Sequence, residues 1–214
     1  MNDRTTMKLR RFVAWACLPI AFVATAAGAA SIVDEWSTVK APPPPALKAV
    51  TVDRKTTALL MLDFNKQTCN TQRRPRCIAS IPKVAKLLAS ARDAGVPVMY
   101  SLGGGGAPAD IARELTPAKD EPVVSSGLDK FVGTELESIL KQKGIKTVII
   151  VGTAAHGAVL YTATAAATRN LQVVIPLDGI SGDIPYVEQY TAWHLVNAPR
   201  IETVTLTTID DVKF

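Results

Sequence analysis

The strongest constraint on the fold is an unbroken apolar run, TALLMLDF, over residues 57–64. A strand with one face in solvent alternates apolar and polar side chains, whereas a strand covered on both faces is apolar throughout. Strands of the second kind belong mainly to parallel sheets with helices packed on both sides. The run therefore predicts the central strand of an α/β domain, and it ends in a carboxylate at Asp63.

Strand and helix patterns alternate along the rest of the chain. The clearest further strand is KTVIIVG at 146–152, and weaker strand patterns lie at 96–101, 121–124, 172–177 and 204–206. Helical patterns occupy the segments between them, at 80–94, 134–143, 157–169 and 186–197, with a short helical turn at 111–115. Short strands separated by helices predict right-handed βαβ units and a mostly parallel sheet.

Two of these helices carry recognisable start signals. Ser80 is expected to cap the first helix, with Pro82 in its first turn. Thr134 is expected to cap the second, with Glu137 completing a capping box.

The first 30 residues have the pattern of an export signal. A basic start precedes an apolar run of about 13 residues, too short to span a bilayer comfortably, and small residues follow up to Ala30. We predict a signal peptide at 1–30, cleaved near Ala29 or Ala30, and a periplasmic or secreted protein with no stable membrane insertion after cleavage. A retained membrane anchor is the alternative, and the pair Arg10 and Arg11 leaves Sec and twin-arginine export both open.

A proline-rich linker is expected at 31–54, followed by one domain at 55–214. The linker contains four consecutive prolines at 42–45, which favour an extended backbone. The formal net charge of +5 falls to about +2 once the signal, which carries +3, is removed. No long basic stripe remains, so we expect no nucleic-acid partner.

The mature chain has two cysteines, Cys69 and Cys77. In an oxidising compartment a disulfide is expected, closing a loop of about nine residues and contributing about 2–3 kcal/mol. Two thiols and the histidines His156 and His194 are too few for a confident ligand set, so we predict no metal site. Nothing in the sequence implies an organic cofactor.

Three arginines, Arg73, Arg74 and Arg76, lie inside the expected disulfide loop. They can form a solvated basic loop or meet an anionic ligand, and the sequence leaves both open. The glycines at 103–106 lack the GxxxxGK[ST] pattern of a phosphate-binding loop. Mobility or close backbone approach explains these glycines equally well.

Ligands of an open α/β sheet bind beyond the carboxyl ends of its strands. That rule selects Asp63, Phe64, Asn65, the glycines at 103–106, Ser125, Ser126, the residues at 153–158 and Asp178. Among them Asp63 and His156 are the catalytic candidates, and Phe64, Ser125, Thr153, Gly157 and Ala158 are the substrate-binding candidates. A carboxylate that ends a buried run needs a partner, unless it caps a loop. His156 can be an acid, a base or a satisfied structural histidine, and the amides of Gly157 and Ala158 either bind an oxyanion or simply start a helix.

Four segments are similar to the isochorismatase-like hydrolases, also known as nicotinamidase-type cysteine hydrolases. They are TALLMLDF at 57–64, F-x-x-T-x-L-x-x-x-L at 131–140, KTVIIVGTAAHGAVLYTATAAATR at 146–169 and VVIPLDGIS at 173–181. The resemblance spans roughly residues 55–182 and implies a three-layer α/β/α sandwich with a mostly parallel central sheet. Family members are commonly oligomeric, so a homo-oligomer is expected. The aromatic-rich helix at 186–197 suits either core packing or a subunit interface.

The resemblance also implies a catalytic Asp, Lys and Cys. Asp63 matches the Asp, whereas counting along the motifs places Ser125 at the Lys position and Ala158 at the Cys position. Lys130 lies five residues beyond Ser125, and Lys66 is a weaker candidate for the amine. The metal-binding histidines of nicotinamidases have no counterpart at 101–115.

An alanine cannot be a nucleophile, so thiol acyl-enzyme chemistry at Ala158 is excluded. The isochorismatase branch also lacks the Cys; it cleaves a vinyl ether by proton transfer, and its turn is similar to Ala155-His156 here. The sequence therefore predicts an exported hydrolase of a small polar metabolite that works by non-thiol acid/base chemistry. The alternatives are a catalytically degenerate periplasmic small-molecule-binding protein with the same pocket, and an interaction protein with a vestigial pocket.

Overall fold

The computed structural model describes residues 30–214, so the predicted signal peptide lies outside the described residues except for Ala30. One compact unit runs from Pro42 to Phe214, and the short helix α1 (Ile32–Glu35) belongs to a separate N-terminal unit that ends at Ala41. The compact unit thus begins before the boundary at residue 55 that the sequence predicts. The cause is a small parallel pairing of β1 (Val50–Thr51) with β9 (Val212–Lys213), which draws the second half of the linker into the domain.

The main sheet is parallel throughout, with the order β4-β3-β2-β5-β6-β8 and with β7 paired to β5. Its strands are β2 (Thr57–Leu62), β3 (Val98–Leu102), β4 (Val123–Ser125), β5 (Thr147–Thr153), β6 (Gln172–Pro176), β7 (Ile180–Ser181) and β8 (Val204–Thr207). The two apolar runs singled out above form the neighbouring central strands β2 and β5. Both are buried along nearly their whole length, as the unbroken apolar pattern predicts.

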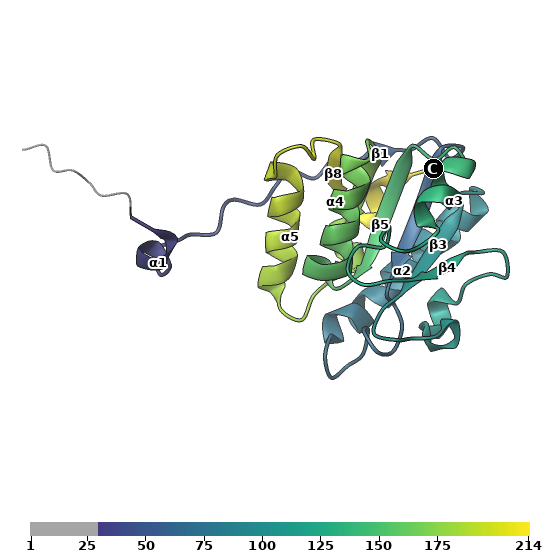
Figure 1. The fold of residues 1–214 in the computed structure, drawn as a ribbon, viewed down its shortest axis with the longest axis horizontal. Coiled ribbons are helices and arrows are strands. Elements are labelled where there is room, and N and C mark those ends of the chain that lie inside the picture. Colours follow the sequence, from purple (N-terminus) through teal and green to yellow (C-terminus); the bar gives the residue numbers. More distant parts are fainter. Residues whose placement is uncertain (1–29) are drawn as a thin grey trace, which may run out of the picture. The chain divides into compact units, whose positions relative to one another are not determined.

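Helices cover both faces of this sheet (Figure 1). Side chains of α2 (Pro75–Asp93) pack on one face, against Leu59 and Met61 of β2. Side chains of α3 (Leu136–Gln142), α4 (Leu160–Thr168) and α5 (Pro185–Asn197) pack on the other, against Leu60 and Leu62. Single helical turns complete the structure, namely η1 (Pro108–Asp110), η2 (Arg113–Leu115), the π-helical η3 (Ala155–Val159), η4 (Leu177–Gly179) and η5 (Ile209–Asp211). The expected three-layer α/β/α sandwich is confirmed.

Two predicted helix starts are wrong, those of α2 and α3. α2 begins at Pro75 rather than at Ser80, and Pro82 lies inside the helix instead of in its first turn. Pro75 takes the first helical position, where the missing N–H of a proline costs nothing, and the Ser80 hydroxyl donates to the Cys77 carbonyl at 2.8 Å.

The capping box predicted for α3 is also absent. The Glu137 carboxylate accepts from Lys141 at 2.6 Å and from Arg169 at 2.9 Å, so it does not return to the helix start. The Thr134 hydroxyl still accepts from the Leu136 amide at 3.2 Å.

Within residues 30–214, no helix combines the length and the apolar character needed to cross a membrane.

Candidate functional site

Asp63 is the first residue after β2, at the carboxyl edge of the sheet. Its φ angle of 58° lies in the left-handed region, which Asp tolerates better than most residues and which is enriched at functional sites. The Ser101 hydroxyl donates to Asp63 Oδ1 at 2.7 Å, and the Lys130 ammonium donates to Oδ2 at 2.9 Å. The carboxylate is therefore buried, fixed in orientation by two donors, and paired with a cation.

Lys130 has no exposed surface, and its ammonium has an acceptor for each of its three protons. Besides Asp63, these acceptors are the Gly127 carbonyl at 2.7 Å and the Ser126 carbonyl at 3.2 Å. The Lys130 amide donates to the Thr162 hydroxyl of α4 at 3.1 Å, which anchors the loop between β4 and α3. The loop thus places the Lys130 ammonium, with all three of its protons in hydrogen bonds, beside Asp63.

The other candidates for the family's amine do not reach Asp63. Ser125, at the position found by counting along the motifs, is exposed at the end of β4. The Lys66 side chain is 71% exposed and pairs with Asp110 at 2.6 Å. Of these three candidates, Lys130 is the one whose side chain contacts Asp63, five residues from the position that the motif spacing indicates.

The glycines at 103–106 pack against the segment that follows Asp63. A Cβ atom at Gly103 would lie 2.6 Å from Asp63 Oδ2, and one at Gly106 would lie 2.4 Å from the Asn65 amide nitrogen. The buried Asn65 side chain donates to the Gly103 carbonyl at 2.9 Å and accepts from the Gly103 amide at 3.2 Å. Close backbone approach, one of the two explanations left open, therefore accounts for Gly103 and Gly106, whereas Gly104 and Gly105 have positive φ angles of 62° and 73°.

The turn after β5 supplies the other predicted site residues. Thr153 is buried, its hydroxyl donates to the Ser181 carbonyl at 3.0 Å, and its peptide bond to Ala154 is cis. The Gly157 amide already donates to the Ala154 carbonyl at 3.0 Å, so it is not free to hold an oxyanion. His156 is partly exposed, and its buried Nδ1 atom has no hydrogen-bond partner among residues 30–214.

Two predicted substrate-binding residues have other surroundings. The Phe64 side chain is buried in the core between the sheet and α2, so core packing explains the presence of a phenylalanine at this position. Ala158 is buried in the core on the opposite face and offers a methyl group where the family's thiol is expected. Ser101 was missed by the sequence analysis, because a serine inside an apolar strand gives no signal of its contact with Asp63.

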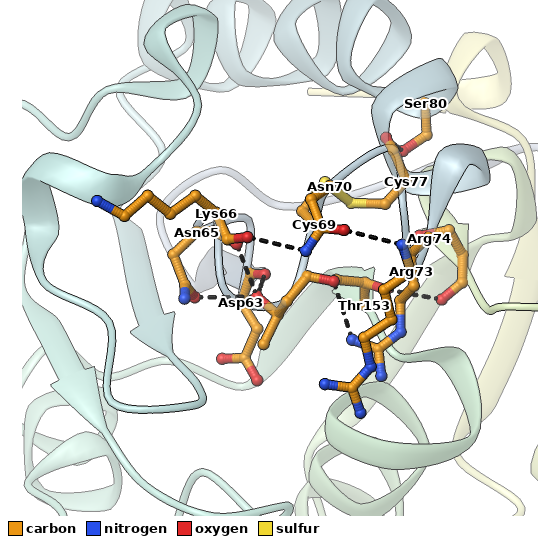
Figure 2. Close-up of a disulfide and its surroundings, with 12 residues drawn as sticks. Asp63, Asn65, Lys66, Cys69, Asn70, Arg73, Arg74, Cys77, Ser80 and Thr153 are labelled. Carbon is orange, nitrogen blue, oxygen red and sulfur yellow. Dashed lines mark hydrogen bonds between the residues drawn. A yellow bond between two sulfur atoms is a disulfide. The ribbon is translucent and has the colours of Figure 1, made fainter.

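The expected disulfide joins Cys69 to Cys77 and fixes the loop that carries the arginines (Figure 2). Arg73 is exposed, and Arg76 pairs with Glu188 of α5, with Nε 2.7 Å from Oε1. Arg74 is buried instead, and its guanidinium donates to the Thr68 carbonyl at 2.9 Å. Burial, and to a lesser extent Arg73, lowers the pKa of Arg74, whereas Asp183 and Asp63 act in the opposite direction. A solvated basic loop therefore describes Arg73 but not Arg74.

The site is nearly closed. The side chain of Asp63 is only 7% exposed, and neither Asp63 nor Lys130 lines the three surface hollows of about 450, 260 and 480 Å³ in the described part of the chain. Across residues 30–214, no three side chains of His, Cys, Asp and Glu lie close enough together to hold one metal ion.

Comparison with known proteins places this geometry in context. The isochorismatase domain model matches residues 57–208. The secreted isochorismatase effector Isc1 of Verticillium dahliae is 33% identical over 146 residues, which cover 63% of this chain and 72% of that protein. An N-carbamoylsarcosine amidase from Arthrobacter is 28% identical over 145 residues and 55% of each chain. The crystal structure of an isochorismatase family protein from Desulfovibrio vulgaris superposes with a TM-score of 0.64 at 24% identity, covering 73% of this chain and 95% of that one.

Proposed function

The chain belongs to the isochorismatase domain family, and from that premise we propose that it is an exported hydrolase of a small polar metabolite that works without a thiol. The observation that carries the proposal is the buried contact between Lys130 and Asp63, 2.9 Å at the carboxyl edge of the sheet. An ion pair so deeply buried is costly to keep for stability alone, because desolvation offsets most of its attraction. Its position at the expected ligand-binding edge favours a role in chemistry.

The residues around this pair suggest how the reaction proceeds. Asp63 transfers a proton to or from the reacting atoms, while Lys130 and Ser101 hold its carboxylate in place. His156 assists through its unpartnered Nδ1, and the Ala158 amide remains our candidate donor to developing negative charge. Because Ala158 excludes a covalent thioester, an activated bond such as a vinyl ether suits this set better than an amide.

Export is supported by three independent features. The N-terminal sequence has the pattern of a signal peptide, the Cys69–Cys77 disulfide suits an oxidising compartment, and the relative from Verticillium dahliae is described as secreted. We therefore propose a periplasmic or secreted location, with a small molecule as the ligand.

A small-molecule-binding protein with the same pocket is the second candidate. Two observations favour it, namely the methyl group of Ala158 at the nucleophile position and the nearly closed surroundings of Asp63. In this case the pair Asp63 and Lys130 would bind and orient a ligand without turnover.

A hydrolysis screen on residues 31–214, expressed with the disulfide formed, tests the proposal. The panel contains small vinyl ethers, esters and amides, with Asp63→Asn as the matched control. Each reaction is repeated after treatment with iodoacetamide, since both cysteines of the mature chain are already bonded to each other. We expect turnover that survives the reagent and is lost in Asp63→Asn, whereas binding without turnover on any substrate would favour the second candidate.

A further inference from the structure

Only three charged side chains are buried within residues 30–214, and they are Asp63, Arg74 and Lys130. Asp63 and Lys130 neutralise each other through their ion pair. Arg74 makes no ion pair with any residue in the described part of the chain. Arg74 is therefore the one buried charged side chain of residues 30–214 without an ion-pair partner, an arrangement that an anionic ligand would stabilise.

The Arg74 guanidinium lies close to the candidate site. Thr68 connects the two, because its carbonyl accepts from Arg74 Nη1 at 2.9 Å while its hydroxyl donates to the Asp63 carbonyl. Asp63 is also near enough to act on the pKa of Arg74, in the upward direction. Figure 2 draws Arg74, Asp63, Thr153 and the disulfide in one view.

Buried polar atoms without partners also occur in this region. Arg74 Nε and Ser181 Oγ are both buried and have no hydrogen-bond partner among residues 30–214. Ser181 pairs in register with Thr153 at the ends of β7 and β5, and β7 packs against α2, whose first residue follows Arg74. Buried donors are nearly always satisfied in folded proteins, so unpartnered donors near the ligand-binding edge favour a ligand contact there.

We propose that Arg74 recognises a carboxylate group of the substrate, and that the Cys69–Cys77 disulfide holds Arg74 in position for it. The inference rests on the proposed function, whose substrate class it narrows to small carboxylic acids. A planar guanidinium fork matches the two oxygens of a carboxylate, and titration with phosphate distinguishes a carboxylate from the other anion that such a fork accepts. Asp183 is exposed and is the acidic side chain of this chain that competes for Arg74.

The test measures binding separately from turnover. Residues 31–214 are titrated with matched pairs that differ in one group, benzoate against benzamide and fumarate against fumaramide, and with inorganic phosphate. Binding is followed by thermal shift and isothermal calorimetry for wild type, Arg74→Gln, Arg74→Lys, and the control Arg73→Gln, which removes an exposed arginine of the same loop.

We expect the carboxylates to bind wild type and Arg73→Gln, and the amides not to bind. Arg74→Gln should weaken carboxylate binding about tenfold or more, since hydrogen bonds to charged groups are the stronger ones, and Arg74→Lys should lie between. Asp183→Asn should bind carboxylates at least as tightly as wild type. Equal binding of acids and amides, binding of phosphate in place of carboxylates, or unchanged affinity in Arg74→Gln would each overturn the inference.

Two further comparisons distinguish a failure of carboxylate binding by Arg74 from a failure of the proposed hydrolase function. If Arg74→Gln does not fold, as judged by circular dichroism, the acid–amide comparison on wild type and the Arg74→Lys affinity decide. Carboxylate binding through Arg74 with no turnover on any substrate would remove the hydrolase proposal and leave this inference standing. Turnover of neutral substrates that is unaffected by Arg74→Gln would do the reverse.

Discussion

At the scale of single residues, the site depends on the buried contact between Asp63 and Lys130, in which each charge is the partner of the other. Lys130 has three acceptors and Asp63 has two side-chain donors, so neither group lacks a partner. Removing one member of such a pair leaves the other charge buried and unpaired, which costs far more than the net value of the pair. Stability and chemistry are therefore linked at this contact.

Lys130→Met should lower the free energy of unfolding by about 3–5 kcal/mol, because the Asp63 carboxylate would remain buried without its cation. Chemical denaturation measures this value. The double variant Asp63→Asn/Lys130→Met should recover part of the loss. Lys141→Met, which breaks an exposed pair with Glu137, is the control and should cost less than about 0.5 kcal/mol. Equal costs for Lys130→Met and Lys141→Met would contradict the description of the site.

Gly103→Ala should displace the Asp63 carboxylate, because the added Cβ would lie 2.6 Å from Oδ2. We expect a loss of activity larger than the loss of stability, measured by kcat/KM and by thermal unfolding of the same preparation. At Gly127 an added Cβ meets no atom within 4 Å, so Gly127→Ala controls for the effect of replacing a loop glycine on stability. Full activity in Gly103→Ala would show that the position of this carboxylate is unimportant.

At the scale of secondary structure elements, the sequence predicts the sheet better than the site. The strands β2 and β5 could be predicted because burial on both faces leaves an unbroken apolar pattern. The contact of Lys130 with Asp63 could not be predicted. It depends on the path of the loop between β4 and α3, and motif spacing gives no information about that path. The sequence cannot tell that Arg74 is buried while its neighbour Arg73 is exposed, because both are arginines of the same loop. Only the folded disulfide loop distinguishes them.

The loop at 103–110, which packs beside Asp63 through Gly103, should open in acid. The Lys66 ammonium, then the Ala107 amide and the Gln67 side chain, hold the pKa of Asp110 well below its usual range. A lowered pKa in the closed loop means that closure is favoured above the ordinary pKa of about 3.9 and is progressively lost as the pH falls below it. Hydrogen exchange at residues 103–107, corrected for intrinsic rates, should show protection that declines below that pH. In Asp110→Asn the protection should be low at every pH; a decline of wild-type size in that variant would exclude Asp110 as its source.

Removing the disulfide should destabilise the protein and loosen Arg74 together. Cys69→Ser/Cys77→Ser should lower the free energy of unfolding by about 2–3 kcal/mol, since a short loop is no longer closed in the unfolded chain. Carboxylate affinity should fall in the same variant, as measured by calorimetry at a temperature where it remains folded. Affinity equal to wild type would show that the loop positions Arg74 without the disulfide.

At the scale of the whole domain, the outer face of α4 and α5 is more apolar than a solvated surface requires. Its exposed aromatic residues are Tyr161, Tyr186, Tyr190 and Trp193. A hollow of about 480 Å³ beside them is lined in part by Tyr161, Tyr190 and His194. Exposed aromatic side chains on two packed helices favour an interaction surface, and a second copy of the chain is the partner we propose.

Light scattering coupled to size exclusion should therefore find an oligomer. Tyr190→Glu should shift the protein to the monomer, because it places a charge in the centre of this face, while Leu47→Glu, at an exposed apolar position outside α4 and α5, should not. A monomeric wild type, or the same shift in both variants, would exclude this face as the subunit contact.

The central claim, that Asp63, held in place by Lys130, carries out hydrolysis without a thiol, is tested most directly by kcat/KM on a vinyl ether carboxylate for wild type and Asp63→Asn, both treated with iodoacetamide. The account predicts turnover by the treated wild type and a decrease of about 10²–10⁴-fold in Asp63→Asn, the usual contribution of general acid–base catalysis. Equal rates for the two proteins, or activity abolished by the thiol reagent, would contradict it.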